Sequence, residues 1–139
     1  MRDLLALLTD EETLNLPTNC VITKAYFDTQ GTDETVFHGV EYKGNHISVC
    51  MSNTSGTLWV NLLQLTRPLQ IRENPKVDDS LKRISFTKDE IIQFVEDVND
   101  RNRIHREVPY VVPGLLILEH LWKHMLNSNA TLGMSIRFL

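Results

Sequence analysis

A carboxylate and an imidazole lie close together in a polar stretch in the last third of the sequence. Asp100 and His105 are separated by four residues, one of which is Asn102. An Asp and a His in one loop can hold a water molecule between them and can remove and return its proton, because the ordinary pKa of histidine is about 6.5. The spacing alone also fits a solvated surface loop. The stretch is therefore a candidate acid–base site.

An oxyanion-stabilising group can lie a few residues further on. Gly114 stands at the start of an apolar helix that we expect over residues 115–126, and Pro113 fits its first turn. Free N–H groups at a helix start, helped by the helix dipole, can hold a developing negative charge. A glycine lets a ligand approach that backbone closely. The expected helix is apolar on most sides, so other structure should wrap it, and it could shelter an acyl chain.

The first half of the sequence predicts a helix followed by strands. Residues 2–15 can form a short helix with leucines loosely grouped on one side. Four stretches of β-strand character then alternate with turn signals such as Lys43-Gly44-Asn45 and Asn53–Gly56. We expect them to form an antiparallel meander, with the last and most apolar stretch the most central. These predicted strands span 19–29, 36–42, 47–51 and 58–65.

The second half predicts the helices that flank the candidate site. A polar connection at 68–80 does not divide the chain into domains, since neither side alone could bury its apolar face. A short strand is expected at 84–86. The capping-box pattern Thr87–Glu90 then begins a helix that should end near Asn99. The helix over 115–126 should stop at 127–129, before a final strand over 132–138.

Composition limits the classes of partner. The formal net charge of −4 argues against nucleic acid as the main partner, because a phosphate-binding surface needs an excess of cations. Anionic carriers such as coenzyme A or acyl carrier protein would need only a few well-placed cations. The two cysteines, Cys20 and Cys50, lie in strand-like contexts and indicate a reducing compartment. The N-terminal stretch lacks signal-peptide character, and no apolar run reaches the roughly 20 residues of a membrane span. We expect a cytoplasmic protein with no membrane partner.

Two short stretches carry a family resemblance, Asn99-Asp100-Arg101-Asn102-Arg103-Ile104-His105 and the helix start Val112-Pro113-Gly114-Leu115-Leu116. With them, residues 83–139 resemble the MaoC-like dehydratase and (R)-specific enoyl-thioester hydratase family. That family has a motif of the form G-D-x-N-P-I-H and a Pro-Gly start to its central helix. The resemblance implies an α+β fold in which residues 1–139 form a single hot-dog domain, a curved antiparallel sheet wrapped around a long central helix.

The resemblance also implies roles for individual residues. Asp100 and His105 match the catalytic pair that activates water, and Gly114 matches the position whose N–H polarises the thioester carbonyl. Asn102 matches the motif asparagine, which we expect to shape the loop. Arg103 replaces the motif proline, and it could bind a phosphate of the thioester carrier or point to solvent. Asn99 replaces the motif glycine, and asparagine is the substitute that best tolerates a positive φ.

The strand order should differ from that of the family. Family members usually continue with several strands after the one that residues 134–139 resemble. The N-terminal helix and meander in residues 1–66 could supply those strands, which would be a circular permutation of the hot-dog sheet. The alternative is an incomplete hot-dog that needs a partner chain. We favour the permutation, because strand number and pattern roughly match.

The resemblance implies an enzyme of the hydro-lyase type. It would interconvert 3-hydroxyacyl and trans-2-enoyl thioesters of coenzyme A or acyl carrier protein, without a cofactor and as a homodimer or higher homo-oligomer. Two alternatives stay open, namely a non-catalytic module that binds an acyl thioester or acyl carrier protein, and a hot-dog thioesterase. His120 and His124 have a spacing that can bind zinc, but no third ligand is evident, so we expect no metal.

Overall fold

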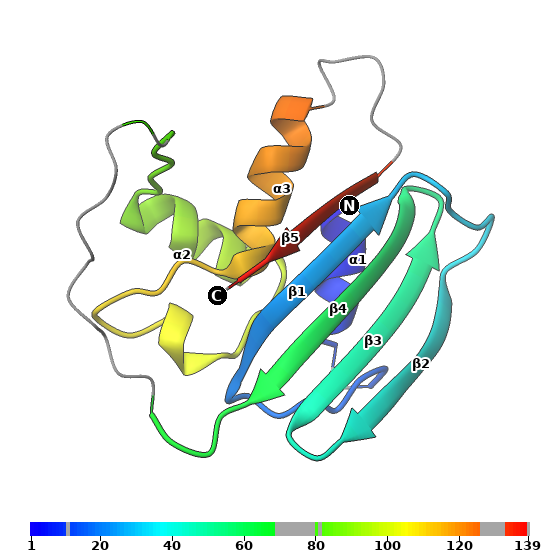
Figure 1. Ribbon diagram of the computed structural model, residues 1–139, viewed down its shortest axis with the longest axis horizontal. Helices are drawn as coiled ribbons and strands as arrows, with labels where there is room; N and C mark the ends of the chain where they lie inside the picture. Colours follow the sequence, from blue (N-terminus) through cyan, green and yellow to red (C-terminus); the bar gives the residue numbers. More distant parts are fainter. Residues whose placement is uncertain (11, 69–79, 81, 126–132, 139) are drawn as a thin grey trace.

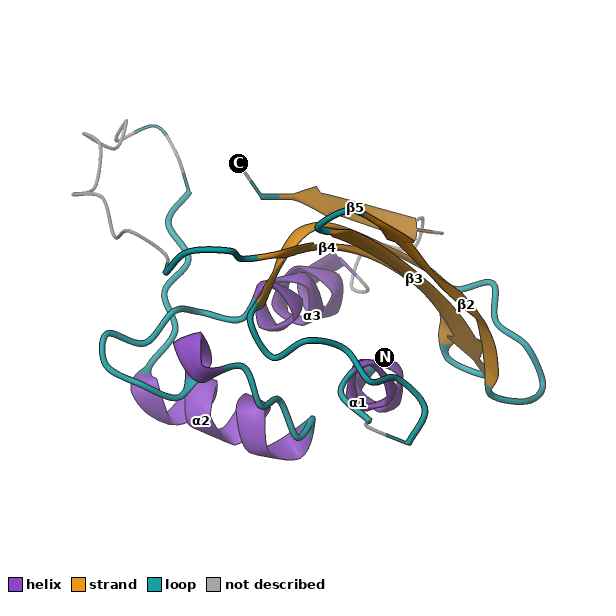
Figure 2. Cartoon of the chain, turned by 90° about the horizontal axis from the view of Figure 1, so that it is seen from below, coloured by secondary structure: helices purple, strands orange, loops and turns teal. Residues whose placement is uncertain are grey.

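A computed structural model describes residues 1–10, 12–68, 80, 82–125 and 133–138. In these residues, five strands form one curved antiparallel sheet with the order β2-β3-β4-β1-β5 (Figures 1 and 2). The expected α+β class and the curved antiparallel sheet are confirmed. The strands are β1 (Cys20–Asp28), β2 (Val36–Lys43), β3 (His46–Asn53), β4 (Gly56–Gln64) and β5 (Gly133–Arg137).

The sheet has one apolar face because apolar residues alternate along its central strands. Residues two apart on a strand point to the same side. On β4 these are Leu58, Val60 and Leu62, all buried, whereas Trp59 points to the other face and is exposed. Strand β4 lies in the middle of the sheet, as its apolar composition predicted.

The predicted meander is correct for β2, β3 and β4 and wrong for β1. The first strand pairs with β4, and not with the strand that follows it in the chain. The reason is that the connection after β1 crosses the β3–β4 turn, where the N–H of Thr32 donates to the carbonyl of Asn53 at 3.0 Å. Gly31 is needed at this crossing, since a Cβ there would lie 2.1 Å from the Asn53 oxygen.

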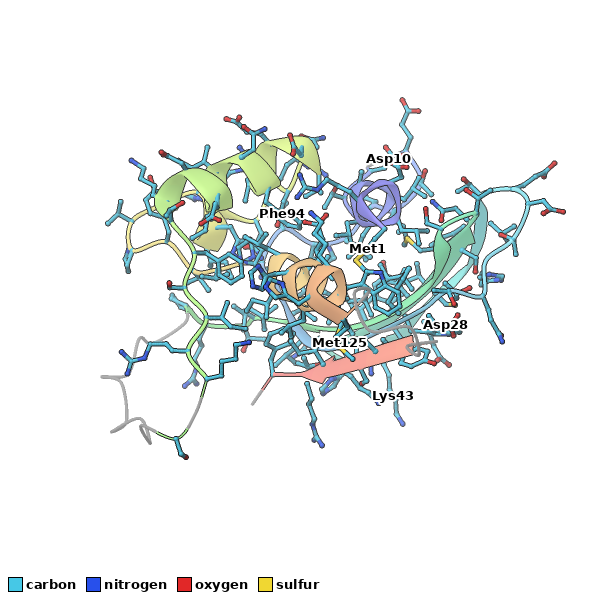
Figure 3. All side chains as sticks on the ribbon, turned by 90° about the horizontal axis from the view of Figure 1, so that it is seen from above. Met1, Asp10, Asp28, Lys43, Phe94 and Met125 are labelled. Carbon is cyan, nitrogen blue, oxygen red and sulfur yellow. The ribbon has the colours of Figure 1, made fainter. Side chains whose placement is uncertain are left out.

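Helices cover the concave face of the sheet (Figure 2). The helices α1 (Arg2–Leu8) and α3 (Gly114–Met125) lie side by side against it, and α2 (Lys88–Asp97) lies farther from the sheet. A short 3-10 turn, η1 (Arg103–His105), follows α2. The core lies between these layers, and Phe94 points into it from α2 (Figure 3). In the described residues no helix combines the length and the apolar character that a membrane span requires.

A cluster of charged side chains ties the three helices together. The Arg2 guanidinium donates to both carboxylate oxygens of Glu119 on α3, at 2.9 and 2.6 Å, and it also pairs with Asp97 on α2. Glu119 is only 4% exposed, and the ammonium of Lys123 lies 3.3 Å from it. Burial raises the pKa of Glu119, but the hydrogen bonds and charges of Arg2 and Lys123 outweigh it and hold that pKa below its ordinary value.

Several element boundaries differ from the predictions. The first helix ends at Leu8 and does not reach residue 15, because Asp10 instead accepts from the hydroxyl of Thr13 and the N–H of Glu12 in a local turn. Residues 84–86 lead into the capping box of α2 without forming a strand, so that prediction was wrong. Most of the predicted loop over 68–80 and the predicted stop at 127–129 lie outside the described residues.

Candidate active site

The end of α2 fixes the start of the loop that contains the candidate acid–base pair. Asn99 has a φ of 50°, in the left-handed region, which asparagine tolerates better than most residues. The N–H of Asn99 donates to the carbonyl of Glu96, and the N–H of Asp100 donates to the carbonyl of Val95 at 2.8 Å. These two bonds form a Schellman motif, which closes the helix and turns the chain so that Asp100 follows directly.

Hydrogen bonds from Asn102 and Arg106 hold the loop after Asp100. The carboxylate oxygen Oδ1 of Asp100 accepts from the N–H of Asn102 at 2.9 Å. The amide of Asn102 donates to the carbonyl of Cys20 on β1 at 2.5 Å, and its Oδ1 accepts from the N–H of Ile104. Arg106 donates to the Asp100 carbonyl at 2.6 Å. Asn102 thus shapes the loop and ties it to the sheet.

The position of His105 determines which of its ring nitrogens can accept a proton. Its Nδ1 lies 2.7 Å from the carbonyl of Val111, and a carbonyl can only accept, so Nδ1 carries the hydrogen. In the neutral ring Nε2 then has a free lone pair. This Nε2 faces Oδ2 of Asp100 at 3.9 Å. His105 is buried and Asp100 is half-buried, so the pair lies inside the fold and not on a solvated loop.

The separation of the two groups suits a bridging molecule. At 3.9 Å, Nε2 and Oδ2 are too far apart for a direct hydrogen bond, which spans about 2.7–3.2 Å. An ionised carboxylate can only accept a hydrogen bond, and in the neutral ring of His105 the lone pair of Nε2 also accepts. One water molecule or hydroxyl group could therefore donate to both.

An apolar cavity of about 230 Å³ adjoins the pair. Asp100, Asn102 and His105 line it together with Gly114 at the start of α3. Most of its other walls are aliphatic and come from the end of α1 and the segment after it, from β1 and β4, from η1 and the residues after it, and from α3. These aliphatic residues are Leu8, Leu14, Leu16, Pro17, Val21, Ile22, Leu62, Ile104, Val111, Val112, Leu115 and Ile117.

The first turn of α3 offers two backbone donors at this cavity. The N–H groups of Leu116 and Ile117 both donate to the carbonyl of Pro113, which places Pro113 at the N-cap and not inside the first turn. Among the described residues, no hydrogen bond satisfies the N–H groups of Gly114 and Leu115, and both residues line the cavity. Such amides at a helix start are suited to an oxyanion.

A side chain occupies the space beside Gly114. A Cβ at Gly114 would lie 2.9 Å from the ring of Phe138, so the glycine is needed for this packing. The ring thus lies where the sequence predicts the close approach of a ligand. Phe138 is fixed alongside β1 by its N–H, which donates to the carbonyl of Thr23 at 2.9 Å.

No family model, curated protein or solved structure matches the chain.

No pattern in the sequence marks three of the cavity residues as part of a site. Thr9, Cys20 and Phe138 line the cavity from parts of the chain that lie far from the motif. The Thr9 hydroxyl is within hydrogen-bond distance of the Val98 carbonyl at the end of α2. Burial raises the pKa of the Cys20 thiol, which keeps it protonated and a poor nucleophile. Only the folded arrangement of α1, β1 and β5 brings these residues to the site.

Two other sets of candidate residues lie apart from the acid–base pair. The side chain of Arg103 is 80% exposed and pairs with Glu107 at 2.8 Å, outside the apolar cavity. His120 and His124 stack with their ring centroids 4.4 Å apart, and Nδ1 of His124 lies 3.0 Å from the His120 carbonyl. In the described part of the chain no three His, Cys, Asp or Glu residues form a group that could hold a metal ion.

Proposed function

We propose that the chain is an acyl-thioester hydratase and dehydratase that uses Asp100 and His105 to activate water. The observation that carries this proposal is the pair of acceptors at 3.9 Å beside an apolar cavity. The resemblance of residues 83–139 to MaoC-like hydratases agrees with it. We also propose that the domain is a hot-dog with permuted strand order. The curved sheet and the packing of α3 against its concave face support this assignment.

The chemistry requires one water molecule and a trans-2-enoyl thioester. Water donates hydrogen bonds to Oδ2 of Asp100 and Nε2 of His105, which aims its lone pair at C3 of the enoyl group. As the C3–O bond forms, one of the two bases takes a proton from the water. The C2–C3 π electrons move toward the thioester carbonyl, whose negative charge the N–H of Gly114 stabilises. The same base then returns the proton to C2, so no other reagent is consumed.

The architecture of the cavity suits this substrate. Its aliphatic walls favour a hydrocarbon chain over a polar substrate. Bulk water is restricted near His105, which strengthens the interaction of the charged groups with the reacting atoms. The walls come from both the sheet strands β1 and β4 and the elements that cover them, including α3 and the stretch around η1, so the acyl chain would lie between the helices and the sheet.

The proposal is tested with trans-2-enoyl thioesters from crotonyl to octenoyl, by following the loss of the conjugated thioester absorbance. Asp100→Asn and His105→Gln should each lower kcat by about 100-fold or more, as expected for loss of a general base. Asp33→Asn and His46→Gln are matched controls, because both residues are exposed and neither lines the cavity. Their rates should equal that of the unaltered protein.

Two results would contradict the proposal. One is that the unaltered protein hydrates none of these thioesters. The other is that the Asp100 and His105 variants retain the rates of the two controls. Thermal melting of each variant checks that its fold is intact.

A non-catalytic acyl-thioester module is the second candidate, and the ring of Phe138 beside Gly114 favours it, because it crowds the proposed carbonyl site. In that case the Asp100 and His105 variants would still bind a saturated acyl thioester as tightly as the unaltered protein, and no variant would turn over. A thioesterase would use the same water to attack the carbonyl carbon. It would release free thiol, which a thiol-reactive dye detects.

A further inference from the structure

A second, larger hollow lies beside the apolar cavity. It has a volume of about 490 Å³ and lies between the residues that follow β4 and the loop around η1. Thr18, Asn102, Ile104 and Val111 line both spaces. The two spaces therefore adjoin at these four residues, and a ligand that fills the first has the second next to it.

The walls of this hollow differ from those of the apolar cavity. Side chains with hydroxyl or amide groups, Thr18, Asn19 and Thr66, alternate with apolar ones. Two arginines line it, Arg67 after β4 and Arg103 in η1. This pairing of cations is notable in a chain whose formal net charge is −4.

One carboxylate opposes these cations. Glu107 also lines the hollow, and its Oε1 accepts a hydrogen bond from Nε of Arg103 at 2.9 Å and lies 2.8 Å from Nη2 of the same guanidinium. Both side chains are exposed, so the ion pair is worth little and can open for a better acceptor. A phosphate group is such an acceptor, because it offers more charge and can take two parallel bonds from one guanidinium.

We infer that this hollow binds the phosphate-bearing carrier arm of the thioester, with Arg67 and Arg103 on its phosphate groups. The inference rests on the proposed function and deepens it. With the acyl chain in the cavity and the carbonyl near Gly114, the sulfur and the arm beyond it leave along the four shared residues. The amide-rich arm then lies against the hydroxyl and amide side chains, and its phosphates reach the two arginines.

The test measures binding and needs no turnover. Isothermal titration calorimetry compares coenzyme A with pantetheine, which has the same arm without phosphate. Coenzyme A should bind at least tenfold more tightly, and the difference should shrink at high salt. Arg67→Glu and Arg103→Glu should each weaken coenzyme A binding at least tenfold. Glu107→Gln should tighten it, because it releases Arg103 from its competing partner.

Arg83→Glu is the matched control, since Arg83 is exposed and lines neither space. It should bind coenzyme A like the unaltered protein. Equal affinity for coenzyme A and pantetheine, no binding of coenzyme A, or equal effects of the Arg83, Arg67 and Arg103 variants would overturn the inference. Failure of the proposed function would show separately, as absent hydration of a thioester that still binds.

Discussion

Replacing Arg2 by methionine should destabilise the protein by leaving Glu119 buried with a single cationic neighbour. Removing one partner of a buried ion pair costs about 3–5 kcal/mol. The cost here should be smaller, because the Arg2 side chain is 36% exposed and the Lys123 ammonium remains 3.3 Å from the carboxylate. We expect about 2 kcal/mol. For 139 residues the entropy of unfolding is about 0.3 kcal/mol per degree, so Tm should fall by about 7 °C.

The lowered pKa of Glu119 determines how the effect of Arg2→Met should change with pH. The folded-state pKa of Glu119 is lowered, so its stabilising effect is complete above the ordinary carboxyl pKa of about 4.3. It is lost as the pH falls through the lowered folded-state value. The difference in unfolding free energy between Arg2→Met and the unaltered protein should therefore be largest near neutral pH and shrink in acid. Urea unfolding at several pH values measures it.

A second substitution separates ion-pair loss from packing loss. Arg2→Met combined with Glu119→Met replaces the pair by apolar side chains, and such exchanges are often neutral or stabilising. The double variant should regain most of the lost stability. Arg83→Met, which removes an exposed arginine elsewhere, should have little effect. If Arg2→Met melts within about 1 °C of the unaltered protein, or if its deficit persists unchanged at low pH, the buried pair does not stabilise the helix junction.

Three further predictions concern the loop and the start of α3. Gly114→Ala should lower the free energy of unfolding by about 1–3 kcal/mol, because the added methyl group contacts the Phe138 ring. Adding Phe138→Leu in the same chain should recover part of this loss, which thermal melting measures. Equal melting temperatures of the single and double variants would contradict this. Asn99→Gly should raise stability by a few tenths of a kcal/mol, and Asn99→Val should lower it by about 1–2 kcal/mol, in urea unfolding, because φ is 50°. Asn102→Ala removes the hydrogen bond to the Cys20 carbonyl and should lower kcat for the proposed hydration about tenfold or more, with little change in KM. An unchanged kcat would mean that the loop keeps its shape without that hydrogen bond.

Local patterns predicted the elements of the fold well, because each depends on neighbouring residues. Thr87 and Glu90 form the capping box of α2 as their spacing indicated. The tolerance of asparagine for positive φ agrees with the φ of 50° at Asn99. The proximity of Asp100 to His105 also follows from one short loop.

The features of the fold and the site that could not be predicted from the sequence depend on contacts between distant segments. The pairing of β1 with β4 arises because the loop containing Gly31 crosses the β3–β4 turn, and no periodic pattern encodes that crossing. Thr9 and Phe138 reach the cavity only through the packing of α1 and the pairing of β5 with β1. The space beside Gly114 was assigned to a ligand because the partner of that glycine lies 24 positions later in the chain.

The location of β1 between β4 and β5 has a consequence for how the protein matures. During synthesis β1 can pair with β4 early, but its other edge must wait for the residues that form β5, which emerge more than a hundred positions later. Until then the unpaired edge of β1 and the apolar lining of the cavity are exposed to other nascent chains. A ribosome-bound intermediate that lacks β5 should therefore be the form most prone to aggregate and most dependent on chaperones.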